Sequence, residues 1–522
     1  MHAPNPIDAL RRVVAADEIV TAQSELEFYG HDVYAAGVPL LAVLRPASIS
    51  SLQDALRALG DSAVAIVPRG GGMSYTGGYL ASRPDTLLVD LSRLDRVLEV
   101  NLEDMYVTVE AGITWRALDE ALAPQGVRPR FWGPLSGLHA TVGGSLSQGS
   151  AFLGAGAHGI SADNVLGLDL VTVDGELLRT GSAAGGGRSA FFRHHGPDLT
   201  GLFTGDCGAF GCKVRVTLPL VRRHAALETA SFAFADAAAL LHAMGAIARD
   251  GLATECFAFD AGLQSLRMKR ASLLEDVKSL GRVVGGTGSV LTGIRQGAKV
   301  VLGGRGFLDA AGCSLHLAFE GRTAADASER AAAAQALAEA SGGQSVPGTV
   351  PTVLRSSPFA NITSLLGPEG ERWVPVHGVL PMSRATEAYD AALAVFARHA
   401  RTMDRLGIKS GVLMCTVGAQ GMIVEPCLYW PGEQPPLHQR VLPTGYLAKL
   451  PRHEHDPDTA AAVDGIRHEL RDALEASGAV HFQIGKFYRY ASTLEPATLA
   501  FVRAIKQALD PRGRMNPGAL EG

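Results

Sequence analysis

A short apolar segment, residues 63–68, runs directly into Arg69-Gly70-Gly71-Gly72-Met73-Ser74-Tyr75-Thr76-Gly77-Gly78. Successive glycines allow left-handed backbone conformations, which turn several N–H groups toward one concave site. Such a loop after a buried strand can bind phosphate without a lysine. A plain glycine-rich turn is the alternative, because the loop has neither the P-loop pattern nor the spacing of the dinucleotide-binding fingerprint.

A second cluster of small residues follows further along the chain. It reads Pro134-Leu135-Ser136-Gly137-Leu138-His139-Ala140-Thr141-Val142-Gly143-Gly144-Ser145-Leu146-Ser147-Gln148-Gly149, and continues with Gly154-Ala155-Gly156-Ala157-His158-Gly159. Small residues let the backbone lie flat against a planar ring, while serine and threonine hydroxyls reach phosphate or ribitol oxygens. Two such loops, each after β-structure, indicate a site for one large dinucleotide.

The pair of loops resembles the FAD-binding domain of the vanillyl-alcohol oxidase and p-cresol methylhydroxylase flavoprotein superfamily, and it is also similar to the FAD subunits of D-lactate dehydrogenase and glycolate oxidase. Three later motifs extend the resemblance. They are Asp163-Asn164-Val165-Leu166-Gly167-Leu168, the glycine hinge Leu202-Phe203-Thr204-Gly205-Asp206-Cys207-Gly208-Ala209-Phe210-Gly211, and the tail at residues 505–518. The resemblance covers most of residues 35–222 and 480–519.

The resemblance implies an α+β fold. It predicts a two-part FAD-binding domain of the vanillyl-alcohol oxidase type, with an inserted α+β cap domain in which helices cover an antiparallel sheet. The expected boundaries are 1–224 for the FAD-binding domain, 225–484 for the substrate or cap domain, and 485–522 for a C-terminal segment that returns to the FAD domain. Long alanine-rich helical patterns, at residues 236–249, 324–340 and 387–406, alternate with strand patterns after residue 225 and agree with this division.

The same resemblance implies which residues hold the cofactor. They are Arg69, Gly70, Gly71, Gly72, Met73, Ser74, Tyr75, Gly77, Gly78, Pro134, Leu135, Ser136, Thr141, Gly143, Gly144, Ser147, Gln148, Gly149, Gly154, His158, Gly159, Val165, Gly211, Lys486 and Asn516. The flavin ring is expected at the domain junction, with the substrate on the cap side.

Noncovalent FAD and no catalytic metal are expected. Some relatives attach FAD through a histidine directly after the first glycine run, and this chain has Met73 there. Other relatives use a histidine or tyrosine on a cap strand, and the matching residues 416–424 contain neither. The histidine motifs with which hydroxy-acid relatives bind a divalent metal are also missing, apart from a lone His481.

Tyr488-Arg489 is the first candidate for substrate binding. The segment Gly485-Lys486-Phe487-Tyr488-Arg489 resembles the Gly-x-Tyr-Arg segment that binds the phenolate in the phenol-oxidising branch. A tyrosine hydroxyl beside a guanidinium would hold a phenolate or a carboxylate equally well. The alternative is an ordinary surface arginine beside a half-buried tyrosine.

Four further residues are candidates for catalysis. Arg355 falls where hydroxy-acid relatives keep a carboxylate-binding arginine, and His377 lies on the expected flavin-facing cap strand, where it is a candidate proton acceptor. A satisfied core histidine is the alternative for His377. Glu425 lies in an apolar strand, where a carboxylate must be paired or functional. Tyr75 is placed to reach the edge of the flavin.

Three functions remain open on these residues. The first is FAD-dependent hydride transfer from a para-hydroxyaryl alcohol or alkylphenol to flavin N5, and Tyr488-Arg489 favours it. The second is dehydrogenation of a D-2-hydroxy acid of the lactate or glycolate type, which the loop at residues 74–78 and the hinge resemble more closely. The third is a non-catalytic flavin-binding subunit that transfers electrons.

The amino-acid composition and net charge of the chain argue against some classes of binding partner. A net charge of −5 without a basic stripe argues against nucleic acid, and no apolar run approaches the roughly 20 residues of a membrane span. Six cysteines without a C-x-x-C pair and an N-terminus without a secretory pattern favour the cytoplasm. A small-molecule substrate and an electron acceptor, whether oxygen, a cytochrome or a quinone-linked carrier, are the expected partners, and the resemblance suggests a homodimer.

Overall fold

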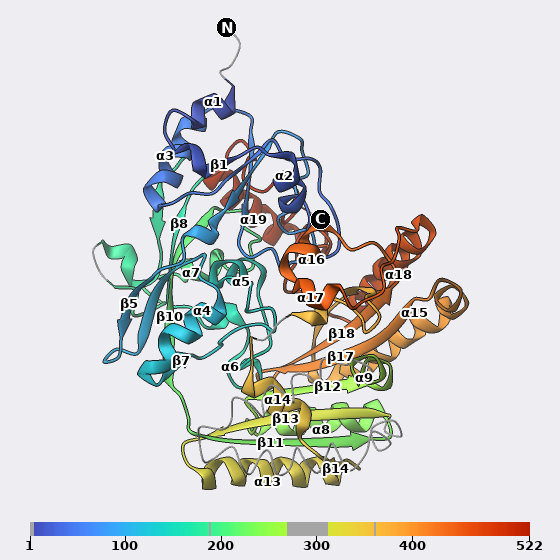
Figure 1. The fold of residues 1–522 in the computed structure, drawn as a ribbon. Helices are drawn as coiled ribbons and strands as arrows, with labels where there is room; N and C mark the ends of the chain where they lie inside the picture. Colours follow the sequence, from blue (N-terminus) through green and yellow to red (C-terminus); the bar gives the residue numbers. More distant parts are fainter. Residues whose placement is uncertain (1–4, 187–188, 269–311, 360–361, 522) are drawn as a thin grey trace.

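The computed structural model describes residues 5–186, 189–268, 312–359 and 362–521, and these residues form three sheets (Figure 1). The first sheet has four strands in the order β1-β2-β4-β3. Its strands β2, β4 and β3 are parallel, and β1 is antiparallel to β2. The strands are β1 (Ile19–Val20), β2 (Ala42–Leu44), β3 (Ala65–Arg69) and β4 (Thr86–Asp90). The first glycine loop therefore begins at the end of an edge strand.

The second sheet is antiparallel and has six strands, in the order β5-β6-β10-β8-β9 with β7 paired to β10. The long strand β10 lies between β6 and β8 and pairs with both. The expected hairpin around Asp174-Gly175 is formed by β8 and β9. The strands are β5 (Val97–Asn101), β6 (Tyr106–Glu110), β7 (Val127–Pro129), β8 (Gly167–Val171), β9 (Leu177–Arg179) and β10 (Cys212–Arg222).

The third sheet has eight antiparallel strands in the order β14-β11-β13-β12-β17-β18-β15, with β16 paired to β18. Every strand follows β10 in the sequence, as expected for the cap. They are β11 (Ala226–Phe234), β12 (Glu255–Asp260), β13 (Cys313–Gly321), β14 (Gln344–Val346), β15 (Arg372–Pro375), β16 (Gly378–Pro381), β17 (Lys409–Val417) and β18 (Gly421–Trp430). The domain boundaries after 224 and after 484 stay a prediction.

Helices surround these sheets. Before β11 the described residues form α1 (Pro6–Leu10), α2 (Gln23–Tyr29), α3 (Ile49–Leu59), α4 (Trp115–Leu122), α5 (Val142–Gln148), α6 (Ala155–His158) and α7 (Leu199–Leu202). After β11 they form α8 (Ala237–Arg249), α9 (Ala261–Met268), α13 (Ala324–Ala340), α14 (Thr349–Ser356), α15 (Ala385–Leu406), α16 (Pro436–Val441), α17 (Thr444–Leu447), α18 (Pro457–Ala476) and α19 (Pro496–Leu509). None of the helices in the described part of the chain is both long and apolar enough to cross a bilayer.

The eight-stranded sheet has two differently covered faces. Side chains alternate between the faces of a strand, so in β17 and β18 the even-numbered apolar residues share one face and the odd-numbered ones share the other. Val412 and Val424 belong to the large core that includes residues of α8, α15 and α18. Leu413 and Ile423 belong to a smaller cluster with Leu263 of α9. Glu425 is odd-numbered, so it lies on the face with α9.

The C-terminal segment returns to the first sheet, as the tail motif predicted (Figure 1). Met515 forms a parallel bridge with Ile66 of β3. The Ile66 N–H donates to the Arg514 carbonyl at 2.8 Å, and the Asn516 N–H donates to the Ile66 carbonyl at 2.8 Å. The tail thus adds a short strand beside β3, next to the start of the first glycine loop.

A buried ion cluster of four side chains joins β7 to the eight-stranded sheet. Arg128 of β7 pairs with Glu320 of β13, and Arg355 of α14 pairs with both Glu320 and Glu255 of β12. All four side chains are less than a tenth exposed. Burial raises the pKa of Glu320, but the charges of Arg128 and Arg355 outweigh it and bring that pKa to about 2. Glu320 therefore stays ionised and holds both arginines.

Replacing Glu320 by Gln should destabilise the fold by roughly 3–5 kcal/mol, because it leaves buried guanidinium charge without its partner. The free energy of unfolding from urea titration would measure this loss. Glu387→Gln is the matched control, because Glu387 makes an exposed pair with Arg384, and exposed pairs contribute little. Equal stability of the Glu320 variant and the control would contradict the role given to the cluster.

Candidate cofactor and substrate site

The two glycine loops touch each other because two positions have no side chain. A Cβ atom on Gly70 would lie 2.2 Å from Thr141 Oγ1, and one on Gly71 would lie 1.8 Å from the His139 carbonyl oxygen. Either contact is shorter than atoms tolerate. The backbone of the first loop therefore lies directly against the start of the second.

The C-terminal segment braces the first loop from behind. The Lys486 N–H donates to the Thr76 carbonyl at 2.8 Å, and its ammonium donates to the Leu80 carbonyl at 2.5 Å. The Asn516 amide donates to the carbonyls of Gly78 and Cys207, at 2.8 and 2.6 Å. Lys486 and Asn516 thus hold the loop in place by hydrogen bonds to backbone carbonyl groups.

A cavity extends between the two loops and reaches the eight-stranded sheet. Many of the expected cofactor residues line it: Arg69, Gly70, Gly71, Gly72, Met73, Ser74, Tyr75, Pro134, Leu135, Ser136, Thr141, Gly143, Gly144, Ser147 and Gln148. The remaining expected residues do not line it: Gly77, Gly78, Gly149, Gly154, His158, Gly159, Val165, Gly211, Lys486 and Asn516.

The cavity fits an elongated anionic dinucleotide. Its walls combine bare glycine backbone with hydroxyl groups of both loops and with three cations, Arg69, Lys213 and Arg267. The Nε atom of Arg69 is buried and has no hydrogen-bond partner within the described ranges. Lys213 is buried and pairs with Asp206 of the hinge at 2.5 Å. Sequence reasoning missed Lys213, which no motif marked.

The part of the cavity nearest the eight-stranded sheet, hereafter the cap chamber, has aromatic and apolar walls. Its residues come from the two loops, from α9, from β15, β17 and β18, and from the segment after residue 481. They are Tyr75, Phe152, Arg267, Trp373, Leu413, Cys415, Ile423, Glu425, Phe482 and Gln483. Only Tyr75 and Glu425 were expected from the sequence. The alternation in β18 could have indicated Ile423, which shares a face with Glu425.

Glu425 is the acidic group of the cap chamber. Burial raises its pKa to about 7, and the charge of Arg267 opposes that shift. The Nε atom of Arg267 is buried and has no hydrogen-bond partner among the residues that the structure describes. A carboxyl group with a pKa near neutrality, in a chamber that also holds a guanidinium, suits proton transfer at an anionic ligand.

His377 and Tyr488 form a buried pair outside the residues that line the cavity. The Tyr488 hydroxyl accepts from the His377 N–H at 2.8 Å and lies 3.2 Å from Nδ1 of the same residue. Burial lowers the pKa of His377 to about 3, so its ring is neutral. Neither residue lines the cavity. Their catalytic roles stay a prediction.

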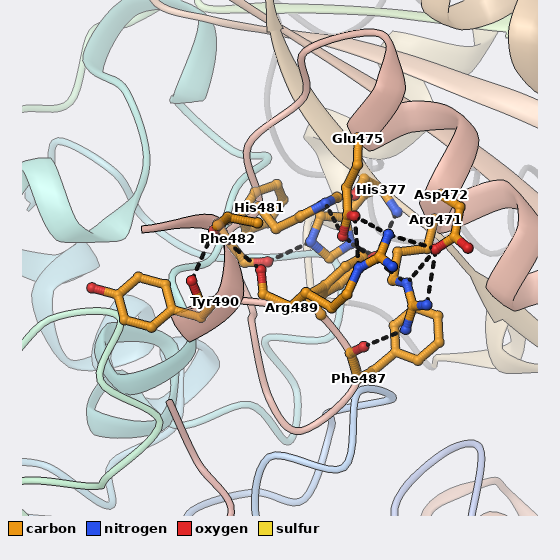
Figure 2. A network of polar contacts seen from close by, with 11 residues as sticks. His377, Arg471, Asp472, Glu475, His481, Phe482, Phe487, Arg489 and Tyr490 are labelled. Carbon is orange, nitrogen blue, oxygen red and sulfur yellow. Dashed lines mark hydrogen bonds and ion pairs between the residues drawn. The ribbon is translucent and has the colours of Figure 1, made fainter. Parts of the chain in front are cut away.

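Arg489 lies in a partly exposed ion network (Figure 2). Its guanidinium pairs with Glu475 and Asp472 of α18, and 41% of its side chain is exposed. The guanidinium of Arg355 forms ion pairs within the buried ion cluster. Neither arginine lines the cavity, so the geometry assigns both to ion pairs rather than to the substrate.

Two family models match the chain. The model described as "FAD binding domain" matches residues 40–181, and the one described as "FAD linked oxidases, C-terminal domain" matches residues 484–520. These matches confirm the resemblance that the motifs predicted. Residues 40–181 therefore match an FAD-binding domain, residues 484–520 match the C-terminal domain of FAD-linked oxidases, and the cofactor of the chain is FAD.

Curated relatives match only part of the chain. D-2-hydroxyglutarate dehydrogenase of Xanthomonas citri pv. viticola is 32% identical over 215 residues, which is 41% of this chain and 43% of the relative. The glycolate oxidase subunit GlcD of Escherichia coli K12 is 30% identical over 250 residues, which is 47% of each. The chain thus spans less than half the length of these two relatives.

Solved structures match nearly the whole chain at low identity. The structure of p-cresol methylhydroxylase with substrate bound covers 99% of this chain and 96% of that protein, at a TM-score of 0.71 and 16% identity. The 4-ethylphenol oxidase of Gulosibacter chungangensis has the same TM-score and coverage at 17% identity. These likenesses confirm the α+β fold with its FAD-binding and cap parts.

Replacing Gly71 by Ala should abolish FAD binding, because the added methyl group would force the two loops apart. The ratio of flavin absorbance to protein absorbance after purification measures the loss. Gly465→Ala is the control, since nothing lies within 4 Å of a Cβ at this position of α18 and its backbone is not left-handed. A Gly71→Ala protein that retains full flavin content would contradict the proposed contact.

Proposed function

We propose that the chain oxidises a small alcohol that carries an anionic group, with a D-2-hydroxy acid as the first substrate class. The observation that carries the proposal is that Glu425 and Arg267 line the same cap chamber, where the charge of Arg267 acts on the Glu425 carboxyl. FAD, when bound, supplies the hydride-accepting group of the reaction. The residues of the chain must bind the anion, orient the carbon and accept a proton.

Glu425 is suited to take the hydroxyl proton. With its pKa near 7, the carboxylate is present at neutral pH and is basic enough to accept a proton. Arg267 can pair with the carboxylate of the substrate, in the planar geometry that guanidinium groups favour. The apolar side chains of Leu413, Ile423 and Phe152 exclude water, which strengthens both interactions.

A para-hydroxyaryl alcohol is the second candidate. The aromatic side chains of Tyr75, Phe152, Trp373 and Phe482 line the cap chamber and favour a ring-bearing substrate. The structure gives less support to the role of Tyr488-Arg489, because neither residue lines the cavity. The names of two sequence relatives, D-2-hydroxyglutarate dehydrogenase and the glycolate oxidase subunit GlcD, support the first class.

Anaerobic mixing of the purified flavoprotein with each substrate class tests the proposal. Bleaching of the flavin absorbance by D-lactate or D-mandelate is expected. Bleaching by vanillyl alcohol or a 4-alkylphenol alone would favour the para-hydroxyaryl class. Bleaching by none of them would leave the electron-transferring subunit as the better explanation.

Glu425→Gln should slow flavin reduction by about 10²- to 10⁴-fold, the usual contribution of a general base. In the parent protein the rate should rise with pH through about 7, because the carboxylate is the active form. Stopped-flow reduction between pH 5 and 9 measures both effects. A parent profile without a step near pH 7 would remove Glu425 from this role.

We also propose that FAD is held noncovalently. Met73 lines the cavity at the place where some relatives carry an attaching histidine, and a thioether forms no such bond. Acid precipitation should therefore release the yellow flavin into the supernatant. Flavin that stays with the precipitated protein would contradict this.

A further inference from the structure

Gln483 holds an unusual backbone conformation in the wall of the cap chamber. Its φ angle is +51°, a left-handed value that residues other than glycine adopt infrequently. Strained backbone of this kind tends to persist where function requires it. We propose that the Gln483 amide contacts the oxygen atoms of the anionic substrate and positions the substrate. This rests on the substrate role proposed above for the cap chamber.

The backbone on both sides of Gln483 is fixed by hydrogen bonds. Its own N–H donates to the Gln148 carbonyl of the second glycine loop at 2.5 Å. The preceding carbonyl, of Phe482, accepts from His377 Nε2 at 2.5 Å. Two residues later, the Gly485 N–H donates to Cys207 Sγ at 3.2 Å. The left-handed conformation is therefore imposed by contacts with both parts of the cofactor site and with the cap.

The hydrogen bond from His377 Nε2 to the Phe482 carbonyl determines which ring nitrogen of His377 carries the proton. A carbonyl only accepts, so His377 Nε2 must carry the proton, and Nδ1 is left to accept from the Tyr488 hydroxyl. The His377 carbonyl in turn accepts from His481 Nδ1 at 2.7 Å (Figure 2). The His481 ring stacks on the Tyr488 ring, with 4.0 Å between the ring centroids. His377 and Tyr488 thus act on the cap chamber through Phe482 and Gln483, as positioning residues.

The Gln483 side chain lies beside Tyr75. Burial and the nearby Glu425 raise the pKa of the Tyr75 phenol, whereas its hydrogen bond with Gln483 lowers it. The phenol therefore keeps its proton at neutral pH. An amide has two donor hydrogens and an acceptor oxygen, so the bond to Tyr75 leaves capacity for a ligand.

A neutral amide suits this position better than a charged group. A cation there would lower the pKa of Glu425 and weaken it as a base, and an anion would repel the substrate that Arg267 attracts. The Gln483 amide adds hydrogen bonds without changing the pKa of Glu425 or the attraction between Arg267 and the substrate. Its expected effect is therefore on binding rather than on proton transfer.

Binding of benzoate to the FAD-loaded protein tests the proposal, with the change in flavin absorbance as readout. Benzoate has an aromatic ring and a carboxylate but no carbon that can be oxidised. In Gln483→Gly, which accepts the left-handed backbone, the dissociation constant should rise about tenfold, as the loss of one or two hydrogen bonds implies. Gln483→Asn, which keeps an amide and tolerates this conformation, should lose less.

The controls separate binding from folding. The flavin content and the melting temperature of Gln483→Gly should equal those of Gln439→Leu, a change at an exposed glutamine of α16. With a substrate that bleaches the flavin, KM should rise by a similar factor and kcat should change less. An unchanged benzoate affinity in Gln483→Gly, or no benzoate binding to the parent protein, would overturn the proposal.

The two proposals fail separately. If benzoate binding depends on Gln483 but no alcohol reduces the flavin, the proposed oxidation is wrong and the anion-positioning role stands. If alcohols reduce the flavin of Gln483→Gly with unchanged KM, the oxidation stands and the role of Gln483 is wrong.

The positioning role of His377 has its own pair of variants. His377→Gln keeps a donor that can reach the Phe482 carbonyl, whereas His377→Leu keeps none. The glutamine variant should recover most of the benzoate affinity that the leucine variant loses. Equal affinity in the two variants would show that Gln483 is held without His377.

Discussion

The site depends on one steric condition, which is that backbone must meet backbone where the two glycine loops touch. Gly70 and Gly71 leave no room for a side chain against Thr141 and the His139 carbonyl. The loops come from different sheets, so their contact also fixes how the first sheet meets the second. The cavity between the loops, and the hydrogen bonds that the C-terminal segment makes to the first loop, both depend on this close contact.

The sequence predicted the FAD-binding part well because its chemistry is local. Glycine runs, the strand before them and the tail motif each carry their own signal, and the cavity lining contains most of the first loop. Lys213 and Arg267 could not be found in this way. The role of Arg267 arises only when α9 and β18, which are distant in the sequence, line one chamber. Lys213 closely follows the hinge, but it belongs to none of the motifs.

The cap was predicted as a type of architecture but not as a site. The family resemblance predicted the antiparallel sheet with its helices, the strand and helix patterns agreed with it, and the position of a carboxylate in an apolar strand singled out Glu425. The proposed roles of Tyr488, Arg489 and Arg355 came from similarity of short segments. In the structure the two arginines are satisfied by carboxylates within the protein, Glu475 and Glu320 among them. Short motifs do not reveal such competing partners, because those lie elsewhere in the chain.

The strand that the tail adds beside β3 has a consequence for biosynthesis. Met515 and Asn516 complete the surroundings of Ile66 and of the first glycine loop, although about 450 residues separate them in the chain. Translation at about 5–20 residues per second takes on the order of 20 to 90 seconds to cover that distance. The nascent FAD half must therefore wait with an open sheet edge while the cap is made. The last hydrogen bonds around the first glycine loop therefore form only after the cap has been synthesised.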